Sequence, residues 1–188
     1  MATAPTLPHV PVDEYLNSTY EHDMEYVDGV LVERSLPTIS DSLLQAILIG
    51  HFRQLEKEYG YKALPELRTQ IIERARYRIP DVMLCPKPLP EGDICIVVPW
   101  AVIEILSPRD TVAATRDRFR DYANIGVQHL VLMDPEEFIA YRVENGRSSR
   151  TNSTRSRCPT AARYPSIPAV CLRNSSLSVR KNNPEIKN

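Results

Sequence analysis

The sequence of 188 residues predicts a fold of the α/β (α+β) class that begins with a β-hairpin. The hairpin is indicated by residues 24–34, MEYVDGVLVER, in which Asp28-Gly29 separates two alternating runs; this dipeptide is typical of a two-residue turn. The mixed class is indicated by the later segments, because stretches with helical spacing at 40–60 and 110–126 alternate with strand-like stretches. The composition, 43% hydrophobic and 25% charged, is ordinary for a soluble globular protein.

The clearest helix is expected at 40–60. Its apolar residues recur at helical spacing, as Leu44, Leu48, Phe52, Leu55 and Tyr59. Ser40 or Asp41 is expected to cap its start, and Gly60 is expected to end it. A shorter helix is expected to start within 11–15, where a proline in the first turn is followed by acidic residues.

A second long helix is expected at 110–126, capped by Asp110 and ended by Gly126. The segments around it have the apolar character and the flanking turn residues of strands. These expected strands are 66–74, 78–85, one within 98–106, 129–134 and 137–143.

The distribution of charge divides the chain into two regions. Residues 1–146 hold 14 Lys and Arg against 23 Asp and Glu, a net charge of −9, whereas residues 147–188 hold 9 Lys and Arg against one acid, a net charge of +8. The second region is rich in Ser, Arg, Asn and Pro and has no sustained period, which is typical of disorder. The sequence therefore predicts a folded domain at 1–146 and a basic tail at 147–188. Two origins of the tail stay open: a natural basic arm that binds phosphates, or a slip of the coding frame after Gly146.

Several classes of protein are not expected. The longest apolar stretch, residues 94–106, is interrupted by Pro99 and Glu104 and is shorter than the ~20 residues of a membrane span. No basic region followed by an apolar core marks a signal peptide. The cysteines form no CxxC pair, so we expect reduced thiols in a cytoplasmic protein; they are Cys85, Cys95, Cys158 and Cys171.

Two carboxylates stand in apolar runs where an isolated charge is costly. Asp81 follows Pro80 in RIPDVMLC, and Glu104 lies in VIEIL. If the two strands are neighbours, they lie ~4.8 Å apart, and both carboxylates can share one divalent cation. Without a cation, their repulsion is expected to raise the pKa of one of them.

The order of these motifs resembles the putative restriction endonuclease family of the PD-(D/E)XK nuclease superfamily. The matching stretches are Pro80-Asp81, EIL at 104–106, SPRDT at 107–111, RFRDYANIGV at 118–127, EYVDGVLVE at 25–33 and LVLMDP at 130–135. The resemblance covers about residues 10–143.

This resemblance implies a restriction-endonuclease-like mixed central sheet flanked by helices. It also implies a bacterial endonuclease that hydrolyses phosphodiester bonds of nucleic acid, DNA in the first place, with Mg²⁺ or Mn²⁺ as cofactor; a homodimer stays open. Asp81 and Glu104 match the residues that hold the metal in the superfamily.

The sequence departs from the family at its lysine. The usual place, two residues after the Glu, is Leu106, and in the resembled family the Lys has moved to the second helix, four residues before the Tyr. With Tyr122 as that Tyr, the position holds Arg118. Because Arg stays protonated, it cannot act as a base. An alternative function is therefore a catalytically impaired nuclease fold that binds nucleic acid.

Further candidates lie at the periphery of the motif. Asp41 stands where family members often carry a His, and we interpret it as a helix cap. Glu25 matches an acid usual in the family, and two interpretations stay open: a ligand at the edge of the site or a solvent-facing strand residue. Two groups of arginines could line one cleft or pair with acids: Arg68, Arg74, Arg76 and Arg78, and Arg109, Arg116, Arg118 and Arg120.

Overall fold

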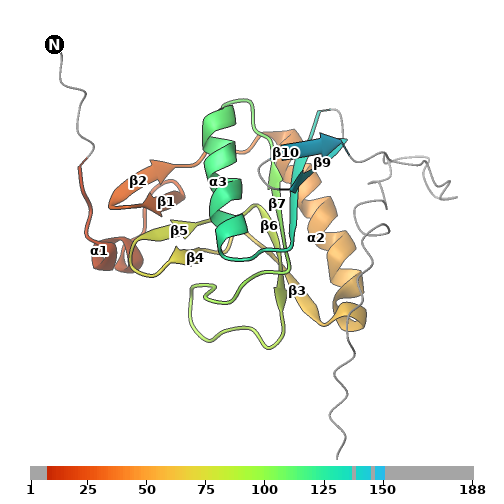
Figure 1. Ribbon diagram of the computed structural model, residues 1–188, viewed down its shortest axis with the longest axis horizontal. Coiled ribbons are helices and arrows are strands. Elements are labelled where there is room, and N and C mark those ends of the chain that lie inside the picture. Colours follow the sequence, from red (N-terminus) through yellow and green to blue (C-terminus); the bar gives the residue numbers. More distant parts are fainter. Residues whose placement is uncertain (1–7, 137–138, 145–146, 151–188) are drawn as a thin grey trace, which may run out of the picture. The chain divides into compact units, whose positions relative to one another are not determined.

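The computed structural model describes residues 8–136, 139–144 and 147–150 (Figure 1). The described part of the chain contains three helices and two sheets. Its elements are α1 (Val12–Asn17), β1 (Met24–Val27), β2 (Val30–Glu33), α2 (Ile39–Tyr59), β3 (Tyr61–Pro65), β4 (Thr69–Ile72), β5 (Arg76–Arg78), β6 (Val82–Pro86), β7 (Ala101–Ile105), α3 (Val112–Asn124), β8 (His129–Asp134), β9 (Ile139–Glu144) and β10 (Arg147–Arg150).

The two sheets have different topologies. A four-stranded sheet has the order β2-β1-β5-β4, and all its neighbours are antiparallel. A six-stranded sheet has the order β10-β9-β8-β7-β6-β3, in which β7 and β8 are parallel and the other neighbours are antiparallel. The mixed central sheet that the resemblance implied is therefore confirmed.

The two long helices cover opposite faces of the six-stranded sheet (Figure 1). Successive strand residues point to opposite faces. Met83 and Val102 pack in one buried cluster with Phe119 and Tyr122 of α3. Helix α2 contacts β3, β6 and β7 and buries Leu44, Leu48 and Phe52. Because Glu104 is two residues beyond Val102 on β7, its side chain points to the α3 face.

The N-terminal hairpin forms as predicted. Asp28 and Gly29 have positive φ angles of 50° and 91°, as a tight hairpin turn requires at both central residues. A side chain at Gly29 would also collide with the ring of His9, whose nearest atom lies 2.0 Å from the position of a Cβ. Helix α1 packs on this sheet through Tyr15, whose ring stacks on that of Tyr26 at 5.0 Å.

The expected strand 78–85 is in fact two strands in different sheets. Arg78 ends β5 of the four-stranded sheet, and Val82 begins β6 of the six-stranded sheet. Pro80 lies between them; it has no backbone N–H to donate to a ladder, and it restricts the residue before it. The strand β3, which starts directly after Gly60, was not predicted, because its five residues follow the helix without a loop.

The helix caps differ from the predicted ones. Thr38, rather than Ser40 or Asp41, is the N-cap of α2; Asp41 completes a capping box by accepting the backbone N–H of Thr38. Thr111, rather than Asp110, caps α3. The prediction for the end of α2 is confirmed, since Gly60 is the C-cap with φ 74°.

Strand β10 lies within the segment that the sequence assigned to the tail, so the sheet extends beyond residue 146. The rest of that segment, with Cys158 and Cys171, lies outside the described residues. Cys85 and Cys95 are buried free thiols. Among the described residues, no helix combines the length and apolar character needed to cross a membrane.

A buried arginine connects the four-stranded sheet with α3. Arg78 Nη1 lies 2.6 Å from Glu25 Oε2 on β1, and Arg78 Nε donates to Asp121 Oδ2 on α3 at 2.7 Å. All three side chains are nearly inaccessible to water. The pairing therefore compensates the buried charges of both acids, and Asp121 is also paired with Arg76.

Replacing Arg78 is expected to destabilise the fold strongly. Arg78→Met should lower the free energy of unfolding by about 3 kcal/mol, the lower end of the range for breaking a buried pair, because Arg76 still contacts Asp121. Urea unfolding measures this change. Arg74→Gln, which removes an exposed pair with Asp13, is the matched control and should leave the midpoint unchanged. Equal midpoints for both variants would contradict the structural role of Arg78.

Candidate active site

The site lies where the chain passes from the four-stranded sheet into β6. A pocket of about 170 Å³ opens there, and its lining includes Asp23, Arg34, Asp41, Gln45, Glu66 and Asp81. These residues come from the hairpin, from the start of α2 and from the segments before β4 and β6. The pocket therefore exists only when both sheets and α2 are assembled.

Asp81 is compensated by groups from two other segments. Its Oδ2 accepts the backbone N–H of Ile105 at 2.6 Å, and its Oδ1 accepts a hydrogen bond from the Arg34 guanidinium. Its own backbone carbonyl accepts from Gln45 Nε2 at 2.9 Å. One carboxylate oxygen is thus held by the neighbouring strand and the other by an arginine.

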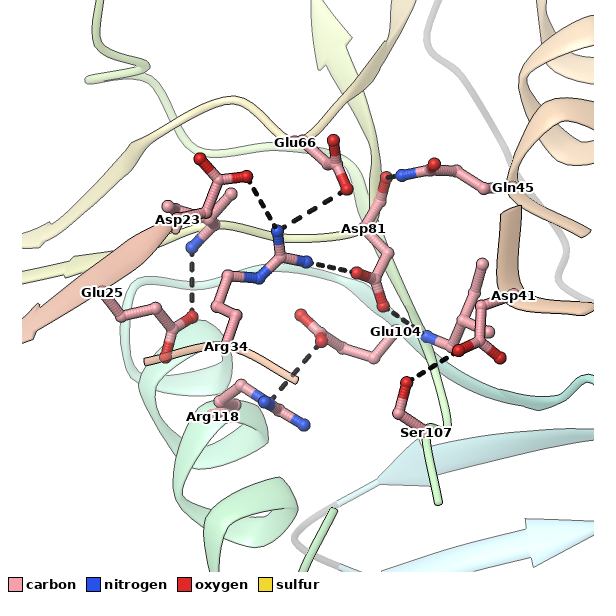
Figure 2. A network of polar contacts seen from close by, with 12 residues as sticks. Asp23, Glu25, Arg34, Asp41, Gln45, Glu66, Asp81, Glu104, Ser107 and Arg118 are labelled. Carbon is pink, nitrogen blue, oxygen red and sulfur yellow. Dashed lines mark hydrogen bonds and ion pairs between the residues drawn. The ribbon is translucent and has the colours of Figure 1, made fainter. Parts of the chain in front are cut away.

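Glu104 lies beside Asp81 across the pair β6 and β7. Val82 is opposite Ile103, so the next position along this antiparallel register brings Asp81 and Glu104 together (Figure 2). Glu104 is 3% exposed, and its Oε1 accepts the hydroxyl of Tyr122 at 2.7 Å. Arg118 Nε lies 3.6 Å from its other oxygen. The structure therefore brings together the two carboxylates that the sequence singled out.

Burial raises the pKa of both carboxyl groups, and the charge of a neighbouring carboxylate adds to the shift of each: Asp81 for Glu104 and Glu66 for Asp81. Burial is the largest cause for Glu104, the charge of Asp81 adds to it, and Arg118 opposes it, so that the pKa rises to about 8. Burial also raises the pKa of Asp81 against the opposing charge of Arg34. Tyr122 keeps the proton that it donates, because burial and the charge of Glu104 raise its pKa well above the usual value.

Arg118 lies beside Glu104, and neither residue is part of the pocket lining. Its Nη2 donates to Asp110 Oδ1 at 2.8 Å, and its buried Nε has no hydrogen-bond partner. Asp110 also accepts the backbone N–H of Ser107 at 2.9 Å. The carboxylate that was expected to cap α3 therefore holds the arginine in place.

The interpretation of Glu25 as a solvent-facing residue is wrong, because the residue is 2% exposed. Its two oxygens contact Arg78 and the backbone N–H of Ile79. Its charge still reaches the site, where it is one of the influences that raise the pKa of Glu104.

Asp41 faces the pocket as well as capping its helix. Its Oδ2 accepts the hydroxyl of Ser107 at 2.9 Å and the backbone N–H of Thr38 at 2.9 Å. Its Oδ1 is buried and has no hydrogen-bond partner. The side chain is 5% exposed and lines the pocket. Its role as a helix cap, expected from the sequence, is therefore present in the form of the capping box.

The two groups of arginines do not line this pocket. Several of them pair with acids elsewhere, as Arg74 with Asp13, Arg76 with Asp28 and Asp121, and Arg120 with Asp117. Among the residues that line the pocket, the one Lys or Arg is Arg34. The sequence did not predict that Arg34, Gln45 and Glu66 line the pocket. The one sequence signal for Arg34 was its position directly after the second strand of the hairpin.

The donor set fits Mg²⁺ or Mn²⁺. No group of three or more His, Cys, Asp or Glu able to hold a metal occurs among the described residues, which does not suit a closed structural zinc site. Mg²⁺ is usually held by one or two carboxylates together with waters and substrate phosphates. Asp81 and Glu104 supply such a pair of neighbouring carboxylates, and burial raises the pKa of each.

Comparison with known proteins shows a family and a fold that this chain shares. The Uma2 family, described as putative restriction endonuclease, matches residues 12–159. A solved structure of a putative nuclease belonging to DUF820, from Anabaena variabilis ATCC 29413, aligns with a TM-score of 0.65 and 22% identity over 75% of this chain and 83% of that chain. The DrdV–DNA complex aligns with a TM-score of 0.39 and 17% identity over 60% of this chain and 10% of its own. No curated protein matches the chain.

At 22% identity, the likeness to the Anabaena structure is evidence for the fold alone. The match to the Uma2 family model is evidence for membership of that family. That match covers most of the chain and spans the hairpin, both candidate carboxylates and α3, where the resemblance was first found. It also runs past residue 146, the predicted end of the domain. The chain belongs to the Uma2 family of putative restriction endonucleases.

Proposed function

We propose that this protein is an endonuclease that hydrolyses phosphodiester bonds of nucleic acid, DNA in the first place, with Mg²⁺ or Mn²⁺ held by Asp81 and Glu104. The observation that carries the proposal is the placement of these two carboxylates side by side on neighbouring strands, both with a raised pKa. A divalent cation between them would relieve their repulsion and compensate their burial.

The charge of the pocket supports a requirement for a metal. Four carboxylates line it against one guanidinium, a net charge of −3; they belong to Asp23, Asp41, Glu66 and Asp81. A phosphate anion is repelled by such a lining unless a cation neutralises it. When bound, the metal supplies a nucleophilic water at neutral pH and stabilises charge on the phosphate oxygens.

The chain's own groups orient the two ligands. The Ile105 N–H fixes one oxygen of Asp81, and the Tyr122 hydroxyl fixes one oxygen of Glu104. Gln45 holds the backbone at Asp81. Such supporting hydrogen bonds set the direction and basicity of metal ligands. Glu25 acts at a distance, because it anchors the chain at Ile79, two residues before Asp81.

Arg118 has the role of a positioning residue in this proposal. Its charge lies near Glu104 and lowers the pKa of that carboxyl, which favours the ionised ligand. It remains protonated and cannot take a proton from water. Arg118 is therefore not assigned the role of the base in this proposal.

A second candidate function is a nuclease fold that binds nucleic acid without cutting it. The contact of Arg118 with Asp110 favours this candidate, because it holds the arginine that replaces the family's lysine away from the pocket. In addition, no lysine lines the pocket. Divalent-metal binding and cleavage assays on one preparation separate the two functions.

Removing one proposed ligand is expected to abolish metal binding and cleavage together. Asp81→Asn keeps an acceptor for the Ile105 N–H but loses the charge, so calorimetry with Mn²⁺ should show no binding. Cleavage of mixed DNA and RNA substrates with Mg²⁺ or Mn²⁺, and its suppression by chelator, should be lost in parallel. Asp13→Asn, at an exposed carboxylate paired with Arg74, is the control. Mn²⁺ binding of wild-type strength in Asp81→Asn would reject this metal site.

Restoring the family's lysine tests the position of Arg118. Arg118→Lys is expected to raise the rate of cleavage or leave it unchanged, because a lysine there can orient water and, at a lowered pKa, accept a proton. The measurement is kcat at saturating DNA. A loss of more than tenfold, about 1.4 kcal/mol of barrier, would show that the arginine is itself required. Inactivity of both forms would favour the binding function.

The raised pKa of Glu104 predicts the pH dependence of stability without metal. Between the ordinary value of 4.5 and about 8, the folded protein keeps a proton that the unfolded chain releases. The free energy of unfolding therefore falls as pH rises through this interval, by at most about 1.4 kcal/mol per pH unit from this group. Urea unfolding in chelator at pH 5.5, 7 and 8.5 should show this decline, and Glu104→Gln should flatten it. Parallel curves for the two proteins would contradict the shift.

A further inference from the structure

We propose that Arg34 binds a phosphate of the substrate and that its guanidinium rests on Asp81 until a divalent cation takes over that carboxylate. This inference rests on the proposed function and deepens it, because it assigns a residue to the recognition of the phosphate. It concerns a residue that the sequence motifs do not include.

The contacts of Arg34 leave much of its donor capacity free for a ligand. Its Nη2 donates to Asp81 Oδ1, whereas Nη1 lies 3.6 Å from Glu66 Oε1 and 3.8 Å from Asp23 Oδ2 (Figure 2). The last two are ion pairs beyond hydrogen-bonding distance. A guanidinium has five N–H donors in a planar fork. The side chain is 14% exposed and lines the pocket, so a ligand in the pocket can reach it.

A metal at Asp81 competes with Arg34 for the same group. Asp81 Oδ2 accepts the Ile105 N–H, and Oδ1 accepts Arg34, so both oxygens are engaged in the metal-free protein. A divalent cation held by Asp81 would compete with the guanidinium for the negative charge of this carboxylate and would repel it. In this proposal, the guanidinium would then give up its hydrogen bond to Oδ1.

The released guanidinium has partners at the mouth of the pocket. The side chains of Glu66 and Asp23 are 41% and 65% exposed, and both already form ion pairs with Arg34. They keep the guanidinium close to the metal and direct it toward solvent, where a substrate enters. Arg34 can therefore change its hydrogen-bond partner while it remains in the site.

A phosphate is the ligand that fits this arrangement. Arg34 is the one Lys or Arg among the lining residues, and its planar fork suits two phosphate oxygens at once. Arg118 is paired with Asp110 and Glu104 and does not line the pocket, whereas Arg34 does. The metal and Arg34 would thus neutralise the same phosphate from two directions.

The competing explanation is that Arg34 only compensates the buried charge of Asp81. In that case its removal would destabilise the fold and would leave metal affinity unchanged or weaker, since Asp81 would then hold a proton more firmly. The exchange described above requires the opposite: metal affinity rises when the competing guanidinium is removed, and phosphate affinity falls.

The test measures the binding of Mn²⁺ and of a phosphate monoester separately, by calorimetry on the full chain. The probe is thymidine 5′-monophosphate, which contains no diester bond to cut. Arg34→Gln is expected to bind Mn²⁺ at least fivefold more tightly than the wild type. With Mn²⁺ saturating, it is expected to bind the monophosphate at least tenfold more weakly. Arg74→Gln, at an exposed arginine outside the pocket, is the matched control and should change neither constant.

Each outcome decides the inference. Mn²⁺ binding in Arg34→Gln that equals or falls below that of the wild type overturns it, as does unchanged monophosphate binding. If Arg34→Gln does not fold, Arg34→Lys keeps the charge but loses the planar fork. It should then bind Mn²⁺ like the wild type and the monophosphate at least threefold more weakly, and unchanged monophosphate binding overturns the inference. If the wild-type protein binds no Mn²⁺, the proposed metal-dependent function is contradicted. The inference on Arg34 is then overturned as well, because it rests on that function.

Discussion

The burial of Asp81 and Glu104 next to each other is the constraint on which the rest of the site depends. Two adjacent carboxylates in a low-dielectric interior repel one another and lose hydration, so each must be met by donors or cations. The fold meets Asp81 with a strand N–H and Arg34, and it meets Glu104 with Tyr122 and Arg118. These groups come from the end of the hairpin, from β7 and from α3, so their convergence ties the site to the complete fold.

The compensation is incomplete, since both carboxyl groups keep a raised pKa. A protein selected for stability alone would gain from an apolar pair at these positions. Two buried carboxyl groups with raised pKa values are typical of functional sites, where burial and neighbouring charges shift titration. The divalent cation proposed for this site would supply the missing positive charge.

Three arginines with largely buried side chains, Arg34, Arg78 and Arg118, differ in how they are paired. Arg78 contacts two buried acids and joins the four-stranded sheet to α3. Arg118 is likewise fixed, by a direct hydrogen bond to Asp110. Arg34 differs, because it reaches the pocket and two of its three carboxylate partners stand partly in solvent. The acids that pair with each guanidinium thus decide whether it can reach a ligand in the pocket. Its distance from the motif in the sequence does not decide this.

The sequence alone determined the hairpin turn, the end of α2 and the two central carboxylates as candidates. The turn at Asp28-Gly29 and the end of α2 at Gly60 follow from backbone sterics that act within a few residues. The ordered motifs around Asp81 and Glu104 gave the family, which the match over 12–159 confirms. Tertiary structure decided the rest, because the deciding contacts join residues far apart in the chain. Arg34 is 47 residues from Asp81, and Glu25 is 53 residues from Arg78. No periodicity or spacing in the sequence encodes such pairs, since they form only when two sheets and a helix pack around charges that cannot be buried unpaired.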